Sequence, residues 1–282
     1  MGRADGGFKG ITKIVDNGPD GTRWDLLVFA EGYQVGDLGI GRKFDQDVRA
    51  LIADLARISP FDEFTTAVNV FRVDTWSTDK GAWMPPPCGP ASAPKKTLFD
   101  SRFCHNGRKE YLTVDTDWVK EFAANVYPKY EALVVLVNED EYGGSGDGNV
   151  AVCTRKPSTR KLVAHELGHA AFDLADEYEG PGTHPAVEPL AANVTVETIA
   201  ANLKWKSLLT PGAPVPTTRN AVCGACLTTS LPANTVGAFE GGRTRECNVY
   251  RPSVNCRMRD WNSQFGKPCK AEIRARLTPF LP

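Results

Sequence analysis

The segment from Leu162 to Tyr178 constrains this chain more than any other, because it has the pattern of an amphipathic helix with two histidines on one face. On a helix of 3.6 residues per turn, positions four apart lie on the same face, so His165 and His169 point in one direction. Pro157-Ser158-Thr159 supplies an N-cap upstream. The apolar residues gather on the opposite face; they are Val163, Leu167, Ala170 and Leu174.

The two histidines and Glu166 form an HExxH motif, which suits a tetrahedral zinc ion. Zinc lowers the pKa of its water to about 7, so a neighbouring carboxylate can take a proton from that water and pass it to a leaving amine. HExxH also occurs by chance. Here two of the four histidines of the chain fall in it, in a helical context, so we interpret it as a catalytic site for peptide hydrolysis.

Length and charge exclude several other classes of protein. The 282 residues fit one large domain or two small ones, and 41% hydrophobic and 24% charged residues are ordinary for a globular protein. A net charge of −1 gives no reason to expect nucleic acid or an anionic membrane as a partner. No apolar run reaches the length of a transmembrane helix.

The eight cysteines favour a secreted protein with structural disulfides over a cytosolic protein with reduced thiols. Export would need a leader, which the sequence as it stands does not show. Cys88 and Cys104 bracket a loop rich in Pro and Gly over residues 81–96, and a disulfide between them would fix that loop. Cys223 and Cys226 form one CxxC without a second pair or a βαβ context, so we do not expect a zinc ribbon or a thioredoxin site there.

The first half of the chain alternates between strands and helices, which predicts an α/β fold. The expected strands are 24–30, 67–75, 132–137 and 149–154, and the expected helices are 40–57 and 116–130. The first strand, helix and second strand suggest a parallel pair joined by a crossover.

Residues 138–148 read as an acidic, Gly-rich turn. Its carboxylates could hold calcium, but their spacing does not match an EF-hand loop, and a solvated turn fits better. The strand that follows, 149–154, is either an ordinary inner strand or an edge strand that pairs with an extended peptide substrate. The sequence leaves both open.

After residue 180 the composition shifts to loops rich in Gly and Pro, with one expected helix over 195–209. We therefore expect an N-terminal α/β catalytic subdomain over 1–180 and an irregular C-terminal subdomain over 181–282, which together form one catalytic unit. A cleft between two such halves is a common place for an active site.

Several separated segments give the chain its resemblance to a known family. They are Asp25-Leu-Leu-Val-Phe-Ala-Glu-Gly-Tyr33, Tyr142-Gly-Gly-Ser-Gly146, the helix running into Ala175-Asp-Glu-Tyr178, Asn193-Val-Thr195, Lys204-Trp-Lys206 and Tyr250-Arg-Pro-Ser-Val-Asn-Cys-Arg-Met-Arg259. In these segments the chain resembles the IgA-endopeptidase family of zinc metallopeptidases, within the broad metzincin-like group.

The resemblance implies a metzincin-like zinc peptidase with a mixed sheet, an active-site helix and a loop-rich, disulfide-containing C-terminal subdomain. It implies His165 and His169 as zinc ligands and Glu166 as general base. It also implies that Met258 lies in a Met-turn below the metal, with a plain core methionine as the alternative. A disulfide between Cys256 and Cys269 would fix this turn.

The third zinc ligand does not follow the usual metzincin pattern, which would place it at Ala175. Asp176 is the better candidate, because a carboxylate binds zinc well. In a continuous helix Asp176 would lie about 10 Å along the axis from His169, so the chain must turn back near Leu174. Glu177 is the alternative ligand, and Asp173 is expected to support the site without binding the metal.

A donor that stabilises the transition state is also expected, and Tyr250 or Tyr178 could supply it, or either could be a packed aromatic residue. We expect a zinc-dependent endopeptidase that binds a protein or peptide. A non-catalytic binding or adhesion module that retains the zinc site is one alternative. A zinc amidohydrolase acting on non-peptide amides is the other, since it would use the same residues.

Overall fold

The computed structural model describes residues 3–180, 187–219, 231–232 and 234–282. The chain forms two compact units, which are residues 1–171 with 277–282 (unit 1) and residues 172–276 (unit 2). Cys223 and Cys226 lie outside the described residues. The predicted division at residue 180, into two halves of one catalytic unit, stays a prediction.

Unit 1 is built on a mixed six-stranded sheet in the order β1-β3-β2-β4-β6-β5. The four inner strands, β3, β2, β4 and β6, run parallel to one another. The two edge strands, β1 and β5, are antiparallel to their neighbours. The fold class predicted from the sequence, mixed α/β, is confirmed. The bounds are β1 Gly6–Val15, β2 Trp24–Glu31, β3 Val68–Ser77, β4 Ala132–Val137, β5 Gly144–Asp147 and β6 Val150–Thr154.

The edge-strand interpretation of residues 149–154 is wrong, because β6 is paired on both sides, with β4 and with β5. The edge is β5, which lies inside the segment expected to be an acidic turn. Its sequence Gly-Ser-Gly-Asp has low strand propensity, so only its ladder with β6 makes it a strand.

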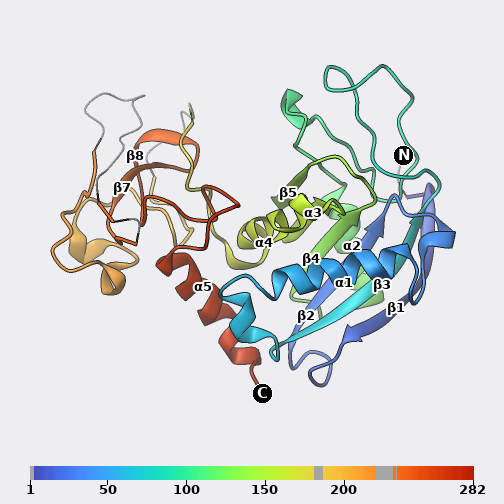
Figure 1. The fold of residues 1–282 in the computed structure, drawn as a ribbon, viewed down its shortest axis with the longest axis horizontal. Coiled ribbons are helices and arrows are strands. Elements are labelled where there is room, and N and C mark those ends of the chain that lie inside the picture. The colour runs from blue at the N-terminus through green and yellow to red at the C-terminus, as the bar shows by residue number, and fades with distance from the viewer. Residues whose placement is uncertain (1–2, 181–186, 220–230, 233) are drawn as a thin grey trace. The chain divides into compact units, whose positions relative to one another are not determined.

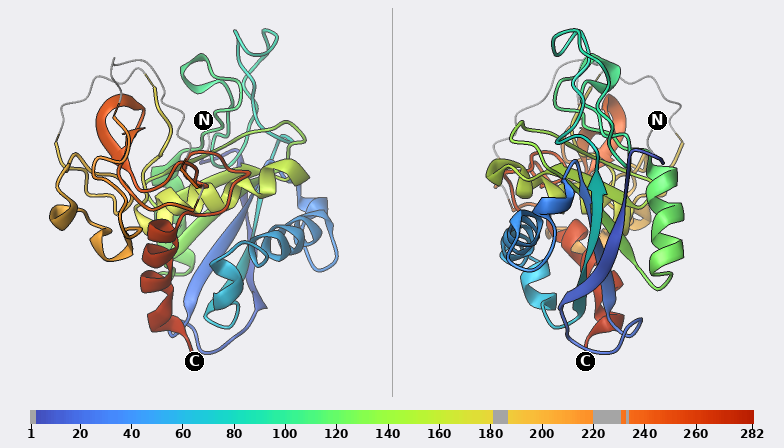
Figure 2. Two further views of the ribbon diagram at one scale, coloured as in Figure 1. Left: turned by 60° about the vertical axis from the view of Figure 1, so that its left-hand side comes forward. Right: turned by 90° about the vertical axis from the view of Figure 1, so that its right-hand side faces the viewer.

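Helices cover both faces of this sheet (Figures 1 and 2). Helix α2 (Thr116–Val126) lies on one face, and α1 (Lys43–Leu55), α3 (Pro157–Arg160) and α4 (Leu162–Phe172) lie on the other. Side chains alternate along each strand, so Leu27 and Phe29 of β2 join the core under α2, while Val28 points to the opposite face. Both faces being covered explains why β2, β4 and β6 are buried along their whole length.

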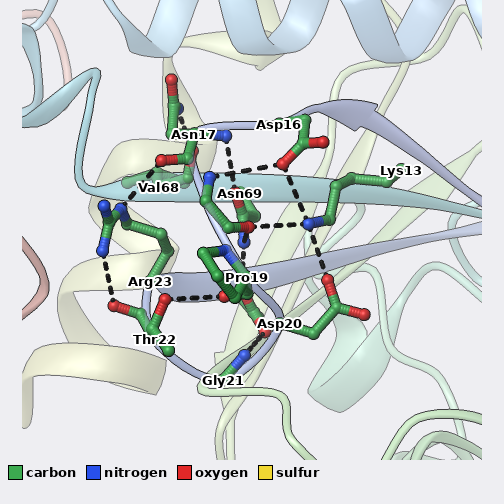
Figure 3. Close-up of polar contacts among 12 residues, drawn as sticks. Lys13, Asp16, Asn17, Pro19, Asp20, Gly21, Thr22, Arg23, Val68 and Asn69 are labelled. Carbon is green, nitrogen blue, oxygen red and sulfur yellow. Dashed lines mark hydrogen bonds and ion pairs between the residues drawn. The ribbon is translucent and has the colours of Figure 1, made fainter. Parts of the chain in front are cut away.

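The loop from β1 to β2 is fixed by a compact polar network (Figure 3). The Lys13 ammonium donates to the Gly18 carbonyl at 2.8 Å and forms ion pairs with Asp16 at 3.0 Å and Asp20 at 2.6 Å. Asn17 ties the loop to β3, because its backbone N–H donates to Asn69 Oδ1 at 2.8 Å. This network holds the edge strand β1 in register. Strand β1 lies at one end of the sheet, and β5 lies at the other.

A buried carboxylate organises the loop after β3. Glu31, at the end of β2 and fully buried, accepts hydrogen bonds from the backbone N–H groups of Phe99 and Ser101, both at 3.1 Å. The predicted disulfide between Cys88 and Cys104 is present and closes the same loop region. The disulfide therefore ties the middle of the Gly81–Lys96 loop to Cys104, and Glu31 fixes the chain just after the loop.

In its described residues, unit 2 has a small hairpin, one α-helix and short 3₁₀ turns. Strands β7 (Phe239–Gly242) and β8 (Arg245–Arg251) are antiparallel, and α5 (Lys267–Leu277) closes the unit. Its apolar cluster comprises Leu203, Trp205, Val236, Ala238 and Tyr250. Near its two chain ends, Asp173 and Arg276 form an ion pair at 2.8 Å. Among the described residues, 3₁₀ turns occur at Val35–Asp37, Phe61–Phe64, His105–Gly107, Ala200–Asn202, Lys206–Leu208 and Thr278–Phe280.

The helix predicted over residues 195–209 is wrong. Only two 3₁₀ turns occur there, at Ala200–Asn202 and Lys206–Leu208. Thr195 uses its backbone N–H and C=O to pair with Tyr250, so neither group is left for a helix. Leu203 and Trp205, two positions apart, both enter the apolar cluster, which an extended segment allows and a helix does not. Throughout the described part of the chain, every helix is too short or too polar to cross a membrane.

Candidate active site

The HExxH segment is helical as predicted. Helix α4 runs from Leu162 to Phe172 and buries Val163, Leu167 and Ala170 against unit 1. The chain enters it through the short helix α3, which has Pro157 in its first turn and is tied to α1 by an ion pair of 2.7 Å between Arg160 and Asp54. The active-site helix is thus anchored to the sheet through its apolar face and to α1 through α3.

The two histidines meet as the sequence predicts. His165 Nε2 lies 3.1 Å from His169 Nε2, and the two rings are nearly perpendicular. Two nitrogens bound to one tetrahedral zinc at 2.0–2.1 Å would lie about 3.3 Å apart. His165, Glu166 and His169 each offer a ligand atom within 4.8 Å of the others. The three residues therefore fit a metal ion.

Strand β5 lies directly against this helix, beside Glu166. A Cβ atom on Gly146 would be 2.8 Å from the Glu166 carbonyl oxygen, 3.0 Å from Glu166 Oε2 and 3.3 Å from His169 Cβ. A Cβ atom on Gly144 would be 2.7 Å from Leu162 on the same helix. The alternating glycines thus let β5 approach α4 without side chains between them. This role was not predicted from the sequence, where its signal is a glycine at every second position, Gly144 and Gly146.

The outer edge of β5 is only partly paired. The Gly144 N–H donates to the Glu110 carbonyl at 3.2 Å, and its carbonyl accepts from Leu112 N at 3.4 Å, so both groups point away from β6. Backbone groups alternate sides along a strand, so Gly146, two residues later, also directs its N–H and C=O away from β6. Within the part of the chain that the structure describes, neither group of Gly146 has a hydrogen-bond partner. This edge, next to Glu166, can accept another strand.

A buried thiol lies behind the site. Cys153 of β6 is fully buried and not in a disulfide. Burial, reinforced by the Glu166 carboxylate, raises the pKa of this thiol to about 12. Cys153 therefore stays protonated at neutral pH and is not a nucleophile.

The segment with the expected third ligand begins where α4 ends. The helix stops at Phe172, and Asp173 has a left-handed backbone with φ 51°, so the chain leaves the helix axis before Leu174. Within unit 2, the Asp176 carbonyl accepts from Arg243 N at 2.7 Å, and the Glu177 N–H donates to the Met258 carbonyl at 2.7 Å. The Glu177 side chain is fully buried and accepts from Asn193 Nδ2 at 3.0 Å.

Comparison with known proteins matches the chain to one family. Residues 12–223 match the sequence model of the family described as IgA Peptidase M64. The chain belongs to the IgA peptidase M64 family. The resemblance inferred from separated motifs is thereby confirmed, and the chain is a metallopeptidase whose substrates are proteins or peptides. A search of curated proteins found no match to the chain.

The M64 match ends at residue 223, before the predicted Met-turn and Tyr250. Met258 is fully buried in a tight turn in which Arg259 N and Asp260 N both donate to the Cys256 carbonyl at 2.9 Å. Tyr250 is buried and packs in the apolar cluster of unit 2, so it has a packing role there. The roles of both residues in catalysis stay predictions.

The disulfide expected between Cys256 and Cys269 in this M64 peptidase is not formed. Both cysteines are free and buried, and their Sγ atoms lie 3.5 Å apart. The calcium site considered for residues 138–148 has no support among the described residues. There Glu139 pairs with Lys95, Asp140 with Arg155 and Glu141 with Lys109.

Proposed function

We propose that this M64 peptidase is a zinc-dependent endopeptidase in which His165 and His169 hold the metal and Glu166 is the general base. The observation that carries the proposal is the 3.1 Å separation of the two imidazole nitrogens, with Glu166 on the same helix turn. Burial of His165 and Glu166 to 7% and 6% exposure strengthens electrostatic interactions between them and a bound cation.

The chemistry divides between the metal and the protein. When bound, zinc polarises the scissile carbonyl and lowers the pKa of a water molecule to about 7. Glu166 takes the proton of the attacking water on its carboxylate and returns it to the leaving amine, so one group serves as base and then as acid. Because α4 is packed against the sheet, Glu166 is held in place before the substrate arrives.

We propose Asp176 as the third ligand. The helix ends at Phe172 and the backbone turns at Asp173, which removes the objection that a continuous helix would carry Asp176 away from His169. The alternative ligand, Glu177, is already engaged by Asn193 and Cys269 inside unit 2. Met258 would lie beneath the metal as in a metzincin-like peptidase, and Tyr250 remains the proposed donor to the transition state.

The substrate, in this proposal, binds as an extended peptide along β5. The outward backbone groups of Gly146 would pair with it, and the lack of a side chain at this position leaves the peptide next to Glu166. The disulfide between Cys88 and Cys104 supports a secreted or extracytoplasmic location.

The test is zinc content together with casein cleavage, for the wild type and for Glu166→Gln. We expect the same zinc content in both proteins and a loss of about 10²–10⁴-fold in kcat in the variant. Glu121→Gln, which removes a surface carboxylate paired with Arg3, is the matched control and should cleave like the wild type. Zinc binding without cleavage by the wild type would favour the binding module, and cleavage of small amides but not of a peptide library would favour the amidohydrolase.

A further inference from the structure

Unit 2 contains a second cluster of metal-binding side chains, separate from the HExxH residues. Glu177, Cys256 and Cys269 are all fully buried, and one ligand atom of each lies within 4.8 Å of the others. They come from three separate segments, which are the chain after Asp176, the turn that holds Met258 and the first turn of α5.

The distance between the two sulfurs matches a shared ion better than a disulfide. A disulfide has an S–S bond of about 2.0 Å, as Cys88–Cys104 shows at 2.02 Å. Two thiolates bound to one tetrahedral zinc at about 2.3 Å lie about 3.8 Å apart. The observed separation of Cys256 Sγ and Cys269 Sγ is 3.5 Å. Cys269 Sγ lies 3.1 Å from Glu177 Oε1, within about 0.5 Å of the value for two ligands on one zinc.

Glu177 also carries an oxygen that is buried without a partner. Its Oε1 atom is engaged by Asn193 and Cys269, but Oε2 has no hydrogen bond. Leaving a buried polar atom unpaired costs about 1–3 kcal/mol, so such an atom in a native structure calls for a ligand. A cation between the carboxylate and the two sulfurs would satisfy it.

The surroundings orient the three side chains as ligands. Gly266 N–H donates to Cys256 Sγ at 3.2 Å, and Asn193 Nδ2 donates to Glu177 Oε1 at 3.0 Å. Such hydrogen bonds fix the direction of metal ligands.

We propose that Glu177, Cys256 and Cys269 form a second, structural zinc site. Two thiolates and the two oxygens of one carboxylate supply four ligands, the number of a closed structural site. As the ion binds, the two thiols release their protons to solvent and two Zn–S bonds form. The site joins the residue that follows Asp176 to the turn that contains Met258.

The test uses the variant His165→Ala/His169→Ala, which removes the HExxH site and keeps all three proposed ligands. Purified with reductant and loaded with Co²⁺, it should bind one ion per chain and show the near-ultraviolet charge-transfer absorption of a cobalt–thiolate bond. In this background Cys256→Ser/Cys269→Ser should lose the band, and Glu177→Gln should weaken cobalt binding at least tenfold. Cys153→Ser, which removes the other free buried thiol of the described residues, should leave the band unchanged.

Two results would overturn the site. One is the absence of a thiolate band in the folded histidine variant. The other is a Cys256–Cys269 disulfide, found by mass spectrometry in wild-type protein purified with zinc and without reductant. Neither readout depends on cleavage, so the catalytic proposal can fail while this one stands, and the reverse also holds.

Discussion

Substitution of Gly146 by alanine tests whether β5 and Glu166 work together. The new Cβ atom would lie 2.8 Å from the Glu166 carbonyl oxygen and 3.0 Å from Oε2, where ordinary contacts begin at 3.4 Å. Strand and helix must therefore separate by about 0.5 Å. A misplacement of about 1 Å costs about 10²-fold in rate, so we expect a loss of about tenfold in kcat. Overpacking should also lower the free energy of unfolding by about 1–3 kcal/mol.

Gly144→Ala separates the two effects. Its Cβ would overlap Leu162 and the Val152 carbonyl at 2.7 Å each, on the same strand and helix but away from Glu166. It should be destabilised to a similar extent, measured by urea unfolding, while its kcat for a peptide substrate stays near the wild-type value. Gly36→Ala, where a Cβ meets nothing within 4 Å, should change neither quantity. A folded Gly146→Ala enzyme with wild-type kcat would show that Glu166 does not depend on the close approach of β5.

Three further predictions concern unit 1. Burial, reinforced by Asp25, raises the pKa of Glu131 to about 7, so its stabilising contribution is complete below pH 4.5 and is lost as pH rises through 7. Because the side chain is only half-buried, we expect a modest effect. Between pH 5 and pH 8 the free energy of unfolding of the wild type, measured with urea, should fall by about 1–2 kcal/mol relative to that of Glu131→Gln. A difference between the two proteins that stays constant with pH would contradict this. Cys153, with a pKa of about 12, should resist iodoacetamide at pH 8 in the folded protein and react once urea unfolds it, as mass spectrometry can check. Arg72 is almost fully buried between Asp45 and Asp74, and Asp45 is also paired with Arg49. Arg72→Met should cost about 3–5 kcal/mol in urea unfolding, because it removes the ion pair of the buried Asp74 and one of the two ion pairs of Asp45; a change below 1 kcal/mol would count against that network.

The parts of the fold that the sequence predicted are those set by local patterns. Helix α4 carries two histidines four positions apart, and β2 and β4 are continuous apolar runs, so each could be assigned from its own residues. Strand β5 could not, because Gly-Ser-Gly-Asp becomes a strand only through its ladder with β6 and its close approach to α4. The helix prediction for residues 195–209 was wrong for a related reason. The backbone N–H and C=O of Thr195 are hydrogen-bonded to Tyr250, which is far away in the sequence.

The candidate site divides in the same way. His165, Glu166 and His169 lie within one helix, so spacing alone brings them together. The positions of the Cys256 and Cys269 sulfurs depend on how a turn packs against α5, which no local pattern encodes. The assignment of Asp176 depends on the path of the chain after Phe172, and the sequence could only show that a turn was needed.

The discontinuity of unit 1 has a consequence for how this chain can change. Unit 1 resumes at Leu277 after the whole of unit 2, so by connectivity unit 2 is an insertion. The ion pair between Asp173 and Arg276 brings the two ends of that insertion together, which is the geometry that lets one domain be spliced into another. Evolution or engineering could therefore exchange residues 172–276 through a single pair of neighbouring junctions, leaving the sheet and the HExxH residues in place.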